Sequence, residues 1–311
     1  MNVALLFPGQ GSQAVGMGAD LFDDHPELLG ETADQILGWS LRSLCRDGPE
    51  EELTRTEKAQ PALFAISFAL WEEFRNVYDG HVAGAAGHSL GEFTALCAGG
   101  AISYPEALRV VSRRGLAMAA AADREPSGMA ALIGADATLA ESIADTRRAA
   151  GGRLEVANIN APEQVVVAGS AIDIVWVTEN ARDLGVRRAI PLKVAGAFHS
   201  SFMEPAAEQV ADALAEVDFA KPRFPIWSNT TARPHLVDAM AETLRAQVVS
   251  AVRFGESLED MAATGIDTFV HIGPGDVTAG MAQRTVEAAN VHVVSAVADI
   301  PGVVDALVTI S

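Results

Sequence analysis

Short apolar runs alternate along the chain with longer segments in which apolar residues recur every three or four positions. The short runs predict five strands of a common core, at residues 3–7, 81–87, 224–229, 268–272 and 292–297. The longer segments predict helices, at residues 26–37, 61–78, 90–98, 104–122, 202–217, 236–250 and 277–288. This alternation of strands and helices is typical of an α/β domain with a mostly parallel sheet.

A second pattern occupies the middle of the chain. Strand, helix, strand, strand, helix and strand are predicted there in turn, at residues 128–135, 137–149, 154–160, 164–169, 172–184 and 187–194. This βαββαβ order is the ferredoxin-like pattern. We therefore expect a discontinuous large α/β domain, residues 1–126 and 195–311, into which residues 127–194 are inserted as a ferredoxin-like subdomain.

Composition narrows the class of protein. The chain has 311 residues, enough for one large core and a smaller lobe, and its net charge of −19 argues against a nucleic-acid partner. No apolar run approaches the ~20 residues that span a bilayer, and the first strand begins without the features of a signal peptide. Cys45 and Cys97 are too few for a disulfide framework or a cysteine-rich metal site. We expect a cytoplasmic protein with reduced thiols, bound to neither membrane nor nucleic acid.

Residues 87–91 read Gly-His-Ser-Leu-Gly, between a predicted strand and a predicted helix. This G-x-S-x-G pattern is typical of a nucleophile elbow, a tight turn that projects the serine hydroxyl above the sheet. Its two glycines let strand and helix pack closely, and the amide of Leu90 is then free to stabilise an oxyanion. Ser89 is therefore the candidate nucleophile, and a tight turn without chemistry is the alternative.

A serine nucleophile needs a base, and seven histidines are available. His199 lies where a predicted strand ends in a loop of small residues, a place where α/β folds build their sites. That position favours His199, with His271 at the end of another predicted strand as the alternative. His88 adjoins the serine, but its side chain is expected to diverge from it. The remaining histidines are expected at the surface, at positions His25, His81, His235 and His292.

A third member of a hydrolase triad is missing from the pattern. The aspartates between Ser89 and His199 lie in the inserted segment or at its border, and none follows a strand of the large domain. The sequence therefore offers no convincing triad acid, which disfavours a plain esterase.

Arg113 and Arg114 lie on a predicted helix that is otherwise almost wholly apolar. Consecutive helical residues point about 100° apart, so the two side chains reach different surfaces. An arginine that points into an apolar cleft would bind a carboxylate through two hydrogen bonds. Without independent support for a cleft, ordinary surface charge is the interpretation to prefer for both.

The loop after the first strand carries glycines that also occur in phosphate-binding loops. Gly9, Gly11 and Ala14 match a relaxed dinucleotide-binding fingerprint, which requires a second strand about 20 residues further on. The residues after Gly18 are predicted to be helical, with no strand before Gly48, and no Gly-Lys-Ser/Thr follows as in a Walker loop. We therefore interpret the loop as a donor of a backbone N–H to an oxyanion hole.

Taken together, these residues resemble the malonyl-CoA:acyl-carrier-protein transacylase family, which includes the acyltransferase domains of polyketide synthases. The resemblance covers nearly the whole chain and rests on six motifs in order: FPGQGSQ at 7–13, GHSLGEF at 87–93, RRG at 113–115, GAFHSSFM at 196–203, the glutamine of LRAQVVSAVRF at 247, and IGPG at 272–275. It implies a hydrolase-like α/β domain with an inserted ferredoxin-like subdomain.

The resemblance also implies a role for each matching residue. Ser89 would be acylated by malonyl-CoA, with His199 as its base, and Arg114 would bind the malonyl carboxylate. The backbone amides of Gln10 and Leu90 would form the oxyanion hole.

Two further positions match the family. Gln247 would lie beside the site, and main-chain carbonyl groups near it would orient the histidine, which accounts for the absent triad acid. Phe198 resembles the malonyl-selective members, although Ala197 stands where many bacterial members have proline. The implied partner is acyl carrier protein, which brings its own phosphopantetheine, and no metal or redox cofactor is expected.

Two other functions are kept as alternatives. A serine hydrolase or thioesterase would resolve the acyl-enzyme with water instead of a thiol. A carrier-binding scaffold without catalysis is the other, and the joint presence of Ser89, His199 and Arg114 argues against it. Fatty-acid and polyketide synthesis both remain open as the pathway.

Overall fold

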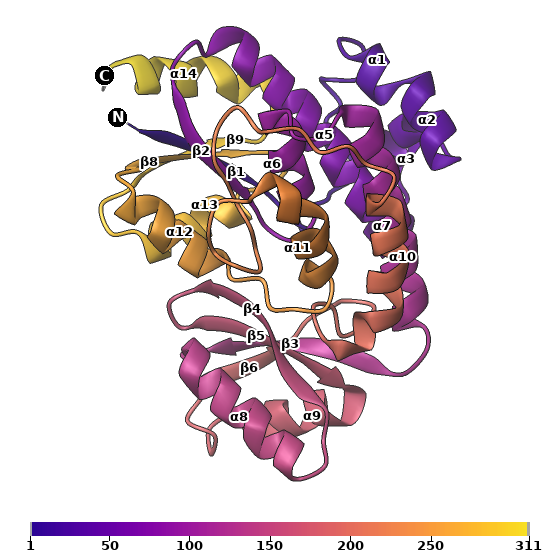
Figure 1. The fold of residues 1–311 in the computed structure, drawn as a ribbon, viewed down its shortest axis with the longest axis vertical. Helices are drawn as coiled ribbons and strands as arrows, with labels where there is room; N and C mark the ends of the chain where they lie inside the picture. Colours follow the sequence, from indigo (N-terminus) through magenta and orange to yellow (C-terminus); the bar gives the residue numbers. More distant parts are fainter. Residues whose placement is uncertain (1, 310–311) are drawn as a thin grey trace.

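The fold is taken from a computed structural model, which describes residues 2–309. A five-stranded sheet in the order β7-β2-β1-β8-β9 forms the centre of the large domain, and its strand pairs are all parallel (Figure 1). Its strands are β1 (Val3–Phe7), β2 (Val82–Gly87), β7 (Ile226–Trp227), β8 (Thr268–Ile272) and β9 (Asn290–Val294). The predicted α/β class with a mostly parallel sheet is confirmed.

The central strand β1 is buried on both faces, and its side chains alternate between two cores. Leu5 belongs to the larger core, and Leu6 belongs to the smaller one on the opposite face. The larger core is built on α5 (Thr56–Val77), α6 (Gly91–Gly99), α7 (Tyr104–Ala122), α10 (Glu204–Leu214) and α14 (Ile300–Thr309). The smaller core is built on α12 (Phe254–Ala263) and α13 (Val277–Thr285).

Short helices complete the large domain. Four of them lie near the N-terminus: α1 (Pro26–Leu29), α2 (Glu31–Leu37), α3 (Leu41–Asp47) and α4 (Glu50–Thr54). Each contacts α5, α7 or another of the four. Later in the chain, α11 (Met240–Gln247) contacts α10. In the described residues, 2–309, no helix combines the length and the hydropathy that a membrane span needs.

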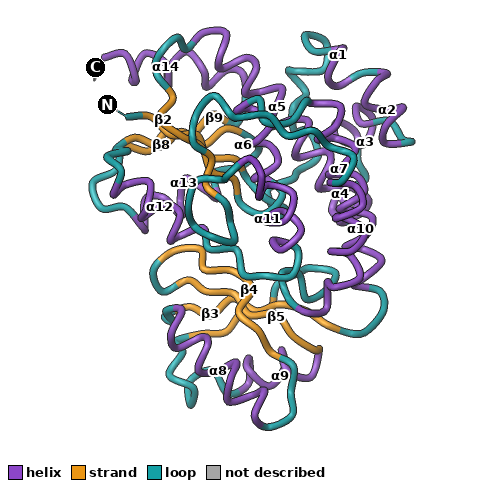
Figure 2. The backbone as a smooth tube through the Cα atoms, in the orientation of Figure 1, coloured by secondary structure: helices purple, strands orange, loops and turns teal. Residues whose placement is uncertain are grey.

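The inserted segment has a sheet of its own, which lies beside the large domain in Figures 1 and 2. Its elements are β3 (Ser127–Ile133), α8 (Ala137–Ala149), β4 (Leu154–Ala161), β5 (Gln164–Ser170), α9 (Ala171–Glu179) and β6 (Arg188–Pro191). The strands are antiparallel in the order β4-β5-β3-β6, which is the ferredoxin-like topology.

The two faces of this second sheet have different partners. Leu132 packs on one face with the side chains of α8 and α9, whereas Met129 joins the core of the large domain. Backbone hydrogen bonds also tie the two parts together, because the Ile159 amide donates to Val252 and the Val252 amide donates to Ala157. One face of the insertion thus forms a wall against the large domain.

Several predicted boundaries are wrong. The helix predicted at 26–37 is two helices separated at Gly30, and β7 pairs over two residues instead of six. The segment after Gly18 forms turns before α1, although it holds no strand, as predicted. Four helices were not predicted: α3, α4, α12 and α14. In α12 the signal was present, because Phe254, Leu258 and Met261 are buried at helical spacing.

Candidate active site

Ser89 lies in the turn between β2 and α6 with a positive φ of 53°. A non-glycine residue in this conformation costs on the order of 1–3 kcal/mol, and the packing around it must hold it there. A Cβ at Gly87 would lie 1.9 Å from the backbone of Gly91, and one at Gly91 would lie 2.4 Å from the Phe7 carbonyl oxygen. Only glycine fits at either position, so the strand and the helix cross as a nucleophile elbow requires.

Asn229, which follows β7, stabilises the elbow through two hydrogen bonds. Its Oδ1 accepts a hydrogen bond from the Ser89 amide at 2.7 Å, and its Nδ2 donates to the Gly87 carbonyl at 2.8 Å. Asn229 is completely buried. The strained turn is therefore fixed at both ends by one side chain.

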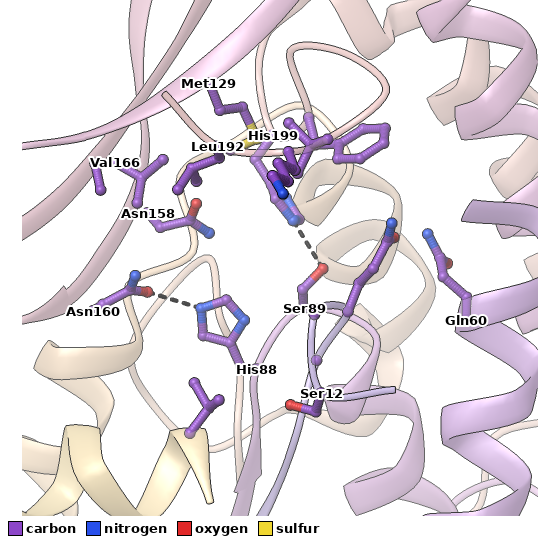
Figure 3. A pocket seen from close by; sticks show the side chains of 18 of the residues that line it. Ser12, Gln60, His88, Ser89, Met129, Asn158, Asn160, Val166, Leu192 and His199 are labelled. Atoms are coloured by element: carbon purple, nitrogen blue, oxygen red, sulfur yellow. Dashed lines mark hydrogen bonds between the residues drawn. The ribbon is translucent and has the colours of Figure 1, made fainter. Parts of the chain in front are cut away.

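His199 provides a base next to the serine (Figure 3). Its Nε2 lies 2.8 Å from the Ser89 Oγ, and its Nδ1 lies 2.7 Å from the Gln247 carbonyl oxygen. A carbonyl oxygen can only accept, so Nδ1 carries the proton and Nε2 is free to accept one from Ser89. The pKa of His199 is lowered to about 3, chiefly by burial and then by the Arg114 charge, so the ring is neutral at physiological pH.

Arg114 reaches the same serine from α7. The Arg114 Nη2 donates to the Ser89 Oγ at 3.0 Å and to the Gln247 Oε1 at 2.9 Å. The Arg114 Nη1 donates to the Gln60 Oε1 at 2.5 Å. Burial lowers the pKa of Arg114 to about 10, which leaves it a cation at neutral pH. The side chain is fully buried, and across residues 2–309 it makes no salt bridge. Neighbouring Arg113 is exposed and pairs with Glu216 at 2.9 Å, so the structure separates the two arginines.

The two predicted oxyanion donors are the backbone amides of Leu90, within the elbow, and of Gln10, in the loop after β1. Leu90 is the N-cap of α6, and Gln10 lies in the loop after β1 that borders the same cavity as Ser89. In the described part of the chain neither backbone amide donates to a protein acceptor. A Cβ at Gly9 would lie 2.6 Å from the His88 carbonyl oxygen, so this loop can approach the elbow only with glycine there. The oxyanion-hole role of the two amides therefore stays a prediction, with no protein acceptor competing for them in the described residues.

A cavity of about 290 Å³ opens above Ser89, between the large domain and the sheet of the insertion. Met129, Asn158 and Val166 line its far wall (Figure 3). The His88 Nε2 donates a hydrogen bond to the Asn160 Oδ1 at 2.8 Å. Most of the cavity surface is apolar, but polar side chains make up about half of the lining residues, so the cavity offers both apolar contact and hydrogen-bonding groups to a small molecule. Phe198, which the family resemblance links to malonyl selectivity, is buried and also lines the cavity.

The expected surface positions of two histidines are wrong. His25 is buried, with its Nε2 2.7 Å from Glu73, and the side chain of His235 is completely buried, with its Nε2 2.6 Å from Glu92. Each is stabilised inside by a carboxylate partner, which the sequence pattern did not indicate. The alternative base His271 is a core residue whose nitrogens face Thr278 Oγ1 and the Gly273 carbonyl.

Three residues around the site were not predicted: Gln60, Glu92 and Asn229. Glu92 is fully buried on α6, and it was recognisable as a single carboxylate in a helix of otherwise apolar and small residues. Gln60 lies on α5 and Asn229 in a loop, and neither carries a local pattern that marks it.

The low pKa of His199 predicts a loss of stability in acid. Between pH 6.5, the ordinary value, and about 3, the unfolded chain binds a proton that the folded protein does not. The free energy of unfolding should therefore fall by on the order of 3 kcal/mol between pH 6.5 and 4 from this group. Urea unfolding at several pH values across this range should show a smaller decrease in the free energy of unfolding for His199→Gln than for wild type. The same change at exposed His81 should leave the slope as in wild type, and parallel curves for wild type and His199→Gln would contradict the prediction.

Comparison with known proteins places the chain among acyltransferases. Residues 4–308 match the family model described as "Acyl transferase domain". The malonyl CoA-acyl carrier protein transacylase of Bacillus subtilis is 41% identical over 91% of this chain and 90% of its own length. PksC, a polyketide biosynthesis malonyl CoA-acyl carrier protein transacylase of the same organism, is 34% identical over 91% of this chain and 96% of its own.

Solved structures agree with these matches. The acyl-carrier-protein S-malonyltransferase of Bartonella henselae superposes with a TM-score of 0.93 at 35% identity, over 99% of both chains. A malonyl-transacylase solved in complex with its type II polyketide synthase acyl-carrier protein gives a TM-score of 0.93 at 32% identity, over 98% of this chain and 100% of that one.

Proposed function

The chain belongs to the acyl transferase domain family, and from this membership we propose that it transfers malonyl groups through Ser89. It is a malonyl-CoA:acyl carrier protein transacylase, which moves the malonyl group from coenzyme A to the phosphopantetheine thiol of acyl carrier protein. One observation carries the assignment of the site: the Ser89 Oγ lies 2.8 Å from a neutral histidine and 3.0 Å from a buried arginine. Relatives in fatty-acid and polyketide synthesis share this activity, so the pathway is one of the two.

The first half of the reaction loads the enzyme. The Ser89 Oγ attacks the thioester carbonyl carbon of malonyl-CoA while its proton passes to the His199 Nε2. The carbonyl oxygen becomes an oxyanion that accepts hydrogen bonds from the amides of Gln10 and Leu90. The carbon–sulfur bond then breaks, coenzyme A leaves as a thiol with the proton from His199, and a malonyl ester remains on Ser89.

The second half reverses these steps with a different thiol. The phosphopantetheine sulfur of acyl carrier protein attacks the malonyl ester, and His199 takes its proton. The same two amides stabilise the second oxyanion, and the ester breaks as the proton returns to the Ser89 Oγ. The protein's own side chains and amides perform each step, and the phosphopantetheine belongs to the partner.

Arg114 selects the acyl group in this proposal. A malonyl carboxylate is planar and carries two oxygens, which match the fork of a guanidinium. Arg114 now donates to the neutral acceptors of Gln60, Gln247 and Ser89, so a carboxylate in the cavity would give it a charged partner. Its buried position makes that ion pair strong, because water screens it little.

The experiment that tests the function is intact-mass analysis after incubation with malonyl-, methylmalonyl- or acetyl-CoA, followed by holo acyl carrier protein. We expect a malonyl adduct on the enzyme that disappears as malonyl carrier protein forms, with little adduct from acetyl-CoA. If the adduct decays to free malonate at the same rate with and without the carrier, the protein is a hydrolase or thioesterase and the proposal is wrong.

We also propose a cytoplasmic location. Cys45 and Cys97 are both buried free thiols in the structure, which suits a reducing compartment. Detection of the protein in fractionated cells, with a cytoplasmic marker beside it, tests this.

A further inference from the structure

Glu92 lies behind the site, three residues after the nucleophile, with its carboxylate fully buried. Its Oε2 accepts hydrogen bonds from the Gln247 Nε2 at 2.7 Å and from the Asn229 amide at 3.2 Å. Its Oε1 lies 2.6 Å from the His235 Nε2. The carboxylate therefore has a nitrogen partner on each oxygen, as a buried charge requires.

Gln247 connects this carboxylate to the reacting groups. Its backbone oxygen faces the His199 Nδ1 at 2.7 Å, and its Oε1 accepts from Arg114 at 2.9 Å. A glutamine amide can be turned either way, and its partners decide which end points where. Glu92 can only accept, so it requires the Nε2 end, which also donates to the Ser89 carbonyl at 2.8 Å, and the Oε1 end is then left for Arg114.

His235 supports the carboxylate from the far side. Its ring is completely buried between Glu92 and Thr243, with 3.1 Å from Nδ1 to the Thr243 Oγ1. Thr243 lies on α11, one turn before Gln247, so the pair ties that helix to α6. Loss of His235 would leave the buried Glu92 Oε1 without this partner, and loss of Glu92 would leave the buried His235 Nε2 without it.

We propose that Glu92, supported by His235, is a positioning residue that fixes the amide of Gln247 and thereby places Arg114 and His199 around Ser89. The inference rests on the proposed function, because it assigns Arg114 to the malonyl carboxylate. It differs from a simple electrostatic role, in which Glu92 acts only as the buried counter-charge of Arg114.

Two variants separate position from charge. Glu92→Gln keeps the length of the side chain and loses the charge, and its amide oxygen can still accept from Gln247 and Asn229. Its NH₂ group then donates to the His235 Nε2, provided that His235 carries its proton on Nδ1, where Thr243 can accept it. Glu92→Asp keeps the charge and is one methylene too short to reach Gln247.

The readouts are kcat/KM for malonyl loading and the preference for malonyl-CoA over acetyl-CoA. We expect Glu92→Asp to lower malonyl kcat/KM by about 100-fold and to reduce the preference, because a small misplacement of catalytic groups has an effect of this size. Glu92→Gln should stay within about tenfold of wild type, the worth of one hydrogen bond, and keep the preference. The preference is a ratio, so it does not depend on the fraction of folded enzyme.

Glu73→Asp is the matched control. Glu73 pairs with His25 and lies about 20 Å further along α5 than Gln60, the residue of this helix that contacts Arg114. The control should behave as wild type. An unchanged preference in Glu92→Asp overturns the proposal, and a Glu92→Gln variant as impaired as Glu92→Asp overturns it in favour of charge. If Glu92→Asp does not fold, His235→Leu takes its place. We expect His235→Leu to reduce the preference for malonyl-CoA over acetyl-CoA, and an unchanged preference would contradict the proposal. Wild type that takes up no malonyl would instead refute the proposed function.

Discussion

Ser89→Ala is expected to lose malonyl loading by about 10⁶-fold, the scale seen when a serine nucleophile that works with a histidine base is removed. In the structure the Ser89 hydroxyl is the group that both His199 and Arg114 contact, at 2.8 Å and 3.0 Å. Alanine fits the same turn apart from the hydroxyl, so the fold should persist. Intact-mass analysis with malonyl-CoA measures the loss directly.

The control for this variant is Ser12→Ala. Ser12 also borders the cavity, but its side chain points away from Ser89 in Figure 3. The Ser12→Ala enzyme should still form the malonyl adduct. An adduct on Ser89→Ala would show that another residue is the nucleophile and that the elbow serves some other purpose.

The parts of the fold that the sequence predicted are those with local signals. The bounds of β1, β8 and α7 agree with the prediction, because each is a continuous apolar or amphipathic segment with clear ends. In contrast, β7 pairs over only Ile226 and Trp227, because Pro225 before it has no backbone N–H to donate and a turn begins at Asn229 after it. Helix α5 begins at Thr56 and runs through Pro61, where burial on both sides of the proline outweighs its local cost.

The site shows the same division. Ser89 was predictable, because the glycines around it describe the turn that holds it. The helical pattern alone did not separate Arg113 from Arg114, and only the family resemblance pointed to Arg114; the packing of α7 then buries Arg114 and leaves Arg113 in solvent. The contacts of Glu92 with Gln247 and Asn229 join residues 155 and 137 positions apart, so no local pattern could reveal them. Sequence reasoning finds the nucleophile, and the network that orients its partners appears only on folding.

Arg114→Ala is expected to abolish the preference for malonyl-CoA over acetyl-CoA. Removal of one partner of a buried ion pair costs about 3–5 kcal/mol, so kcat/KM for malonyl loading should fall by at least about 100-fold. Acetyl-CoA has no carboxylate for Arg114 to bind, so its loading should change much less. The two rates, measured by competition in one reaction, give the preference without regard to the amount of active enzyme.

Arg113→Ala is the matched control, one position away on the same helix. Its side chain is exposed and its ion pair with Glu216 lies at the surface, where such pairs contribute at most about 1 kcal/mol to stability. The control should therefore keep both rates. If Arg114→Ala keeps full malonyl preference, the carboxylate is recognised elsewhere in the cavity, and Arg114 acts on Ser89 alone through its 3.0 Å contact. Loss of preference in Arg114→Ala with retention in Arg113→Ala would assign the carboxylate to the one arginine that α7 turns inward.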